Sequence, residues 1–224
     1  MKRTVIPELL DTDAGTPAEI AAALADLRMV NRWFGGARVM TRLLARVAEV
    51  AGVSELSFLD AGAGSGDVAR AAQEDLGRHG VQLSVTLLDR AVSHLMADEN
   101  GLRRVVGDAL RLPFADASFD VAGCSLFAHH LEPDQIVAFV NEGLRVARHA
   151  VLINDLRRHP MHLALVYAGM PLYRSRLTRH DGPVSIHRAY TSREMRLLLQ
   201  RTRAARVEIS HHYLFRMGAI AWRA

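Results

Sequence analysis

The stretch Ser57–Asp67 (SFLDAGAGSGD) constrains the fold of this chain more than any other part of it. A short apolar run ends in Asp60, three glycines follow at alternate positions, and a helical pattern begins at about Asp67. Glycine adopts backbone angles that other residues avoid, and it lets a ligand lie against bare main chain. The stretch therefore predicts a buried strand, a tight turn and a helix start, which together form the first βα unit of a doubly wound α/β fold.

The spacing of the glycines separates two kinds of ligand. A dinucleotide fingerprint reads Gly-x-Gly-x-x-Gly and holds a pyrophosphate at the helix end. Here the glycines are Gly62, Gly64 and Gly66, and Asp67 stands where the fingerprint has its third glycine, so its carboxylate would repel a pyrophosphate. The pattern Asp-x-Gly-x-Gly-x-Gly, which starts at Asp60, instead resembles motif I of the class I S-adenosylmethionine-dependent methyltransferases. A tight turn without a ligand is the alternative interpretation.

A second acid ends the next predicted strand. Asp89 follows the apolar segment 81–88 and lies 23 residues after Gly66, where a doubly wound fold places the carboxylate that binds ribose hydroxyls. A carboxylate only accepts hydrogen bonds, which suits a vicinal diol. Asp89 could also cap a helix expected over 91–97, and the two roles are compatible.

A third acid strengthens the resemblance. Gly107-Asp108-Ala109, then Leu-Pro-Phe at 112–114 and Ser-Phe-Asp-Val at 118–121, are similar to small-molecule methyltransferases of the ubiquinone/menaquinone-biosynthesis type. In that group the acid at the place of Asp108 accepts from the adenine amino group. The resemblance implies S-adenosylmethionine as cofactor, and it implies these binding residues: Asp60, Gly62, Ala63, Gly64, Gly66, Asp89, Arg90, Gly107, Asp108, Ala109 and Ser125.

The resemblance also implies the architecture. We expect a Rossmann-like α/β fold with a seven-stranded, mostly parallel sheet in the order 3-2-1-4-5-7-6, one antiparallel strand and helices on both faces. Residues 1–52 are expected to form an N-terminal helical lid, and 53–224 the methyltransferase domain, with a substrate-chamber insertion at about 157–190. Within that insertion the pattern predicts an apolar helix over 161–172 and then a basic segment interrupted by Asp181-Gly182-Pro183.

Histidines at two strand ends are the candidate catalytic residues. His129 and His130 follow the fourth predicted strand at the crevice, and His159 follows the fifth. A histidine with an ordinary pKa near ~6.5 can act as a base at neutral pH toward a phenol or an enol. The alternative is that each ring bonds a backbone carbonyl and that catalysis depends on proximity. Adjacent histidines are expected to point apart, so no metal site is predicted.

The acceptor-binding residues are expected on three segments. The junction 31–36 between two predicted N-terminal helices is a candidate lid, with Arg32 and Trp33 facing the acceptor. An ordinary helix–helix turn with an aromatic ring packed inward is an equal alternative. Phe127 and Arg158 are the other expected contacts.

Charge is distributed unevenly along the chain. Residues 1–140 carry 13 basic and 19 acidic side chains, whereas residues 141–224 carry 15 and 5. Arginines in the second part could line a pocket for an anionic acceptor, form a stripe for RNA, or be solvated. We prefer a small, possibly anionic acceptor to nucleic acid, because no basic–aromatic interleaving is present. The arginines in question are Arg157, Arg158, Arg174, Arg176 and Arg179.

Bulk properties set the remaining expectations. The 224 residues contain no apolar run of the ~20 residues that a membrane span needs. Cys124 is the sole cysteine, which favours the cytoplasm. The sequence thus predicts a cytoplasmic enzyme, monomeric or homodimeric, that methylates oxygen or carbon of a small aromatic or polyketide-like acceptor. The alternatives are an RNA or protein methyltransferase and a cofactor-binding relative without catalysis.

Overall fold

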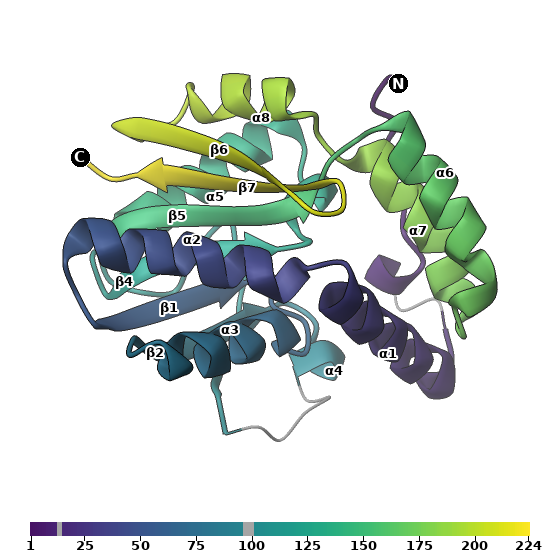
Figure 1. Ribbon diagram of the computed structural model, residues 1–224, viewed down its shortest axis with the longest axis horizontal. Helices are drawn as coiled ribbons and strands as arrows, with labels where there is room; N and C mark the ends of the chain where they lie inside the picture. The colour runs from purple at the N-terminus through teal and green to yellow at the C-terminus, as the bar shows by residue number, and fades with distance from the viewer. Residues whose placement is uncertain (13–14, 96–100) are drawn as a thin grey trace.

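A seven-stranded sheet is the centre of the computed structural model, which describes residues 1–12, 15–95 and 101–224. The strand order is β3-β2-β1-β4-β5-β7-β6 (Figure 1), and only β7 runs antiparallel to its neighbours β5 and β6. Both features confirm the expected topology. The strands are β1 Glu55–Ala61, β2 Gln82–Asp89, β3 Arg103–Val106, β4 Phe119–Ser125, β5 Ala147–Leu156, β6 Arg206–His212 and β7 Arg216–Trp222.

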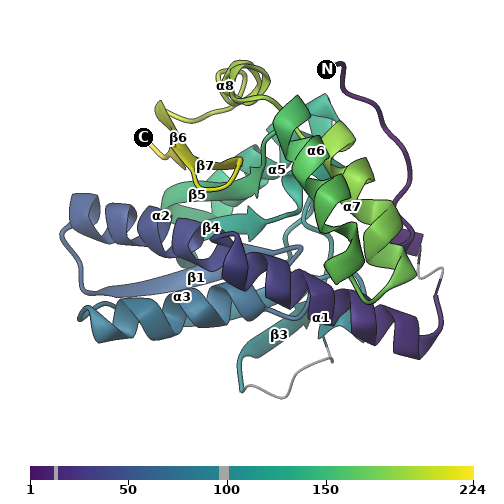
Figure 2. The same cartoon turned by 45° about the vertical axis from the view of Figure 1, so that its right-hand side comes forward.

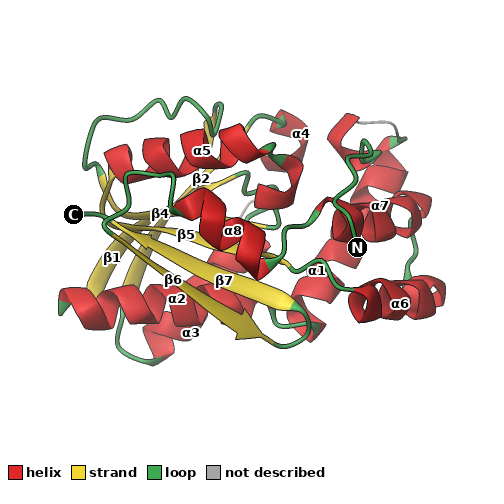
Figure 3. Cartoon of the chain, turned by 90° about the horizontal axis from the view of Figure 1, so that it is seen from above, coloured by secondary structure: helices red, strands yellow, loops and turns green. Residues whose placement is uncertain are grey.

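Helices cover both faces of the sheet, as seen from above in Figure 3. Successive strand side chains point to opposite faces, so Phe58 of β1 packs in the core under α2 and α3 while Leu59 packs in the core under α5 and α8. The helices are η1 Leu10–Thr12, α1 Pro17–Trp33, α2 Gly36–Ala51, α3 Asp67–Arg78, α4 Val92–Leu95, η2 Ala128–His130, α5 Pro133–Val146, α6 Pro160–Gly169, η3 Met170–Leu172, α7 Arg176–Arg188 and α8 Ser192–Leu199.

A group of elements lies beyond the carboxyl ends of the parallel strands. Figures 1 and 2 show α6 and α7 there, with α1 and the N-terminal segment beside them. The Asp26 carboxylate of α1 accepts hydrogen bonds from the backbone N–H groups of Arg174 and Ser175, which precede α7, at 3.0 Å each. These two bonds join the start of α7 to α1, so the two helices are held together beyond the strand ends.

The local signals for helix starts are confirmed at α1. Thr16 accepts from the Glu19 N–H, and the Glu19 carboxylate accepts from the Thr16 N–H at 2.9 Å, with Pro17 at the first helical position. This capping box satisfies backbone groups that a helix end leaves unpaired. A second capping box, from Thr191 to Glu194, begins α8 as predicted.

The second N-terminal helix is not part of a lid. Met40, Leu44 and Val47 of α2 are fully buried in the core against the sheet, so α2 belongs to the layer that covers one sheet face. The packing of α2 against the sheet is therefore contrary to the expectation that residues 36–51 are part of a lid.

The predicted interruption at 181–183 is wrong. The helix α7 is continuous over Arg176–Arg188 with Pro183 inside it, although an interior proline costs roughly 3 kcal/mol. Tertiary contacts stabilise it. Asp181 accepts from two backbone N–H groups of the N-terminal segment, and Gly182 packs so closely on α6 that a Cβ there would lie 3.1 Å from Val166. Of the helix expected over 91–97, the structure has α4, and 96–97 lie outside the described residues.

Across 1–12, 15–95 and 101–224, the helices lack the combination of length and apolar composition that a bilayer span requires.

Candidate active site

A cavity of about 500 Å³ opens at the carboxyl ends of β1, β2 and β4. This is the edge where ligands bind in open α/β sheets, because the strand order reverses between β1 and β4. The glycine loop and the ends of β2 and β3 line one side of the cavity. The residues on that side are Gly62, Gly64, Leu88, Asp89, Arg90, Gly107, Asp108 and Ala109.

The loop after β1 presents bare main chain to this cavity. Gly62 has φ 68°, and a Cβ there would lie 2.4 Å from the ring of Phe127, so no other residue fits. Gly64 has φ 54° and lines the cavity, and among the described atoms none lies within 4 Å of the position its Cβ would take. The space over Gly64 is therefore a cradle that a side chain would fill.

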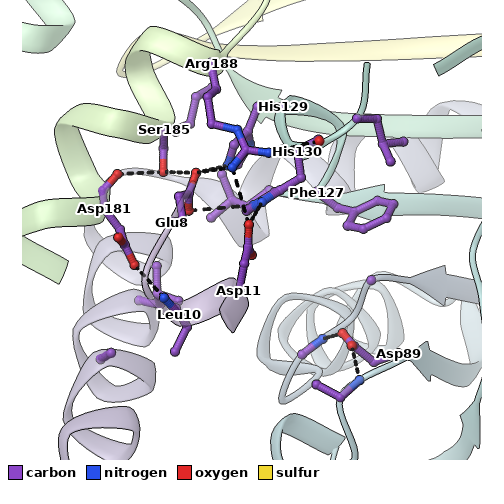
Figure 4. Close-up of a pocket in the computed structure, with 18 of the residues that line it drawn as sticks. Glu8, Leu10, Asp11, Asp89, Phe127, His129, His130, Asp181, Ser185 and Arg188 are labelled. Atoms are coloured by element: carbon purple, nitrogen blue, oxygen red, sulfur yellow. Dashed lines mark hydrogen bonds and ion pairs between the residues drawn. The ribbon is translucent and has the colours of Figure 1, made fainter. Parts of the chain in front are cut away.

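Asp89 joins the glycine loop to the end of β2. One carboxylate oxygen accepts from the Gly64 N–H at 2.8 Å and the other accepts from the Ala91 N–H at 2.9 Å (Figure 4). Each oxygen keeps a second lone pair, so the carboxylate can still accept from a diol. Asp108, which also lines the cavity, accepts from the Leu110 N–H at 2.9 Å.

Asp60 is buried beneath the loop and does not line the cavity. Its Oδ1 atom makes no hydrogen bond with any residue the structure describes. Burial raises the pKa of Asp60 to about 8, and the nearby Asp89 carboxylate contributes to the rise. An unpaired buried carboxyl is costly, and a cation close to it would remove that cost, so Asp60 fits the cationic end of the cofactor.

Three predicted cofactor residues have supporting positions. The Ala63 N–H donates to Leu88 O at 3.1 Å, and a Cβ at Gly66 would lie 2.4 Å from Leu87, so Gly66 permits close loop–strand packing. The Ser125 hydroxyl accepts from Asn154 Nδ2 at 3.1 Å. None of the three lines the cavity within the described part of the chain.

His129 and His130 lie side by side at the mouth of the cavity. Leu126, with φ 54°, turns the chain after β4 so that η2 brings both rings to the same place, with centroids 4.1 Å apart. Both Nε2 atoms face Glu8 of the N-terminal segment: His129 is 3.5 Å from Oε1 and His130 is 3.8 Å from Oε2. Adjacent histidines are expected to point apart unless the loop is irregular, and the irregular turn at Leu126 is that exception.

The opposite nitrogen of each ring is held by another carboxylate. His129 Nδ1 lies 2.7 Å from Asp155 Oδ1, and His130 Nδ1 lies 2.8 Å from Asp11 Oδ2. Burial alone would lower the pKa of His129, but the Asp155 and Glu8 carboxylates outweigh burial and raise it to about 10. Between these two carboxylates His129 is protonated at neutral pH, which argues against its predicted role as the base.

Sequence reasoning missed several residues that face the cavity. Asp155, which is buried behind His129 near the end of β5, could have been found because that strand end lies at the crevice edge. Glu8 and Asp11 stand in an irregular segment with no pattern that places them. His162 of α6 is neutral, since burial lowers its pKa to about 4. The Arg188 guanidinium lies 3.4 Å from Asp11 Oδ2 and 3.9 Å from Glu8 Oε1.

Other predicted residues lie elsewhere. His159 is exposed, accepts from the Met161 N–H at the start of α6 and stacks on Phe215. The 31–36 junction is a helix–helix turn between α1 and α2, but Trp33 is 74% exposed, so its ring is not packed inward. The predicted contacts that fall outside the cavity lining, within the described residues, are His159, Arg32, Trp33 and Arg158. Phe127 does line the cavity.

The expected anion pocket does not form. Arg158 is buried and donates to Ala189 O and to Glu194, and Arg176 pairs with Glu19. Among the residues the structure describes, the cavity lining includes none of Arg157, Arg158, Arg174, Arg176 and Arg179. Arg158 and Arg176 are thus engaged in contacts within the protein.

Comparison with known proteins agrees with this geometry. Residues 58–150 match the family model of a methyltransferase domain. No curated protein sequence matches this chain closely enough to count as a relative.

Solved structures share the fold at low identity. A SAM-dependent methyltransferase from Aquifex aeolicus is 18% identical, with a TM-score of 0.58 over 80% of this chain and 89% of that one. The CurJ carbon methyltransferase is 11% identical, with a TM-score of 0.67 over 96% and 63%. Magnesium protoporphyrin IX methyltransferase from Synechocystis PCC 6803, solved with bound SAM, is 14% identical, with a TM-score of 0.52 over 85% and 80%.

The sheet order, the glycine loop and the cavity at the strand ends are those of a Rossmann-like α/β fold, which the solved methyltransferases share. Together with the methyltransferase-domain match over residues 58–150, this fold supports an enzyme that uses S-adenosylmethionine.

Proposed function

We propose that the enzyme methylates a hydroxyl, or the carbon of an enol, on a small, uncharged and partly apolar acceptor. The observation that carries this proposal is the second half of the cavity, which continues from the glycine loop into a chamber between η2, α1 and α7. A mostly apolar lining with a few convergent polar groups is typical of small-molecule sites. The apolar lining residues are Leu24, Leu27, Val30, Phe127, Val166 and Ile186.

The cofactor supplies a methyl group on a sulfonium, whose C–S bonding pair leaves with sulfur as a neutral thioether when the acceptor attacks. We assign the ribose diol to Asp89 and the adenine side to Asp108 and Ala109, following the resemblance. The Gly64 cradle supports this placement because it leaves room against the main chain. The protein then has to orient the acceptor and exclude water.

We assign to His130 the role of the base that takes the proton from the acceptor hydroxyl. This ring lines the cavity and is more exposed than His129, with 20% of its side chain accessible against 3%. Asp11 holds Nδ1 of His130, so Nε2 faces Glu8 and the chamber. The proton of the acceptor hydroxyl passes to Nε2, and the oxyanion or enolate then attacks the methyl carbon.

The acceptor is uncharged in this proposal because the chamber is rich in carboxylates. Glu8, Asp11 and Asp181 line it, and Arg188 pairs with Glu8 and Asp11. A small-molecule acceptor also fits the enclosed cavity better than RNA or a protein chain. We further propose a cytoplasmic location, from the single buried Cys124, and a monomer or homodimer.

The test is a screen of phenols, quinols and enolisable β-keto compounds, with carboxylate-bearing analogues as a second arm and S-adenosylhomocysteine as the measured product. We expect turnover in the first arm. His130→Asn should lower kcat by about 10²-fold, a typical contribution of a general base. His79→Asn, which changes an exposed histidine just after α3, should not lower it. Turnover only of the carboxylates, or equal kcat in both variants, would contradict the proposal.

A further inference from the structure

The cluster of Glu8, His129 and His130 has the composition of a metal site. One carboxylate oxygen and one ring nitrogen from each residue lie within 4.8 Å of one another. His129 Nε2 lies 3.5 Å from Glu8 Oε1 and His130 Nε2 lies 3.8 Å from Glu8 Oε2, separations that suit a single ion about 2.0–2.2 Å from each ligand atom. Glu8 belongs to the N-terminal segment and the two histidines to η2, which are far apart in the sequence. The three side chains converge on one point of the cavity (Figure 4).

The outer contacts of the cluster are those of histidine ligands. A histidine that binds a metal through one nitrogen almost always gives its other N–H to a carboxylate or a carbonyl, which fixes the tautomer and the ring plane. His129 does this with Asp155 at 2.7 Å, and His130 does it with Asp11 at 2.8 Å. Both Nε2 atoms are thereby directed toward Glu8.

The charges around the cluster also match a divalent cation. Once an ion replaces the proton on His129 Nε2, both imidazoles are neutral, and three carboxylates and one guanidinium leave two negative charges for that ion to balance. Nearby Arg3 does not change this balance, because it pairs with Glu132 at 3.1 Å. The four charged groups that face the rings, among the described residues, are Glu8, Asp11, Asp155 and Arg188.

We propose that Glu8, His129 and His130 bind one divalent transition-metal ion, with the remaining coordination positions open to the acceptor chamber. Two imidazoles and one carboxylate favour Zn²⁺, Fe²⁺, Co²⁺ or Ni²⁺ over Mg²⁺ and Ca²⁺, which prefer oxygen ligands. All three residues line the cavity, so the open positions face the place assigned above to the acceptor oxygen. A hydroxyl bound to such an ion loses its proton more readily.

This inference rests on the proposed function and changes one part of it. The bound ion, and not an uncoordinated His130 ring, makes the acceptor hydroxyl lose its proton. The two are separable, because metal binding is measured without methyl transfer. If the metal is absent and turnover persists, the proposed function stands and this inference fails.

The experiment uses the untagged full chain, stripped with a chelator and titrated with Zn²⁺ by calorimetry and with Co²⁺ by visible absorption. We expect one ion per chain and a Co²⁺ spectrum of nitrogen–oxygen ligation. Glu8→Gln and His130→Asn should abolish saturable binding. Asp11→Asn should weaken it by about 10–100-fold, the usual effect of an outer-shell partner.

His211→Asn is the matched control, because His211 and His212 are another adjacent pair and lie outside the cavity lining described by the structure. Its affinity should equal that of the wild type. Circular dichroism checks that each variant is folded. The inference is overturned if folded wild type binds no stoichiometric ion, or if Glu8→Gln and His130→Asn bind as tightly as the wild type.

Discussion

His129 and Asp60 are both buried ionisable side chains, yet their surroundings favour opposite charge states. His129 lies between the carboxylates of Asp155 and Glu8, so a positive charge is stabilised there. Asp60 has a carboxyl oxygen with no described partner and has Asp89 nearby, so a negative charge is disfavoured. On the acceptor side of the cavity, the carboxylates stabilise a positive charge at His129. On the cofactor side, a cationic ligand would stabilise the ionised form of Asp60.

Asp60 should make the stability of the free enzyme depend on pH. Its folded-state pKa of about 8 lies above the value of ~3.9 in an unfolded chain, so the native state holds the extra proton between these values. Its contribution is therefore largest in acid and is lost as the pH rises through about 8. The wild type should lose up to about 4 kcal/mol relative to Asp60→Asn between pH 5 and pH 8.

Urea unfolding of both proteins at several pH values measures this difference. The two stability curves should diverge as the pH rises, with Asp60→Asn the more stable protein above pH 7. Parallel curves across that range would show that Asp60 is ionised throughout, contrary to its burial.

At the scale of elements, the N-terminal segment closes the acceptor chamber through contacts with α7. Asp181 accepts from the N–H groups of Leu9 and Leu10 at 2.8 and 3.0 Å, just where η1 begins. Glu8 also accepts from the Ser185 hydroxyl at 3.0 Å. The position of Glu8 beside the histidines therefore depends on α7 remaining one continuous helix.

Asp181→Ala should release this segment. Two hydrogen bonds to a charged acceptor would be lost, which typically costs about 1.5–3 kcal/mol each. Hydrogen exchange measured by mass spectrometry should become at least tenfold faster for the amides of Leu9 and Leu10. Asp134→Ala removes an exposed carboxylate at the start of α5 and should leave their exchange unchanged. Equal protection in the two variants would contradict the role given to Asp181.

At the scale of the whole molecule, the sequence predicted the sheet and the cofactor side because local patterns encode them. Three glycines at alternate positions and acids at successive strand ends predict a ligand site at the carboxyl ends of the strands of an open α/β sheet. Asp89 and Asp108 lie on the cavity for this reason. The acceptor side was predicted poorly, because Glu8 and Asp11 reach η2 across more than a hundred residues, and no local pattern reports such a contact.

Calorimetric titration with S-adenosylmethionine tests most directly whether the loop after β1 is a cofactor cradle. We predict one site in the wild type, no binding of NAD, and an affinity about 100-fold weaker in Asp89→Ala, as expected when hydrogen bonds to a carboxylate are lost. Asp75→Asn, which changes a carboxylate near the far end of α3, should bind as the wild type does. An absence of binding in the wild type, or equal affinity in Asp89→Ala, would contradict the account.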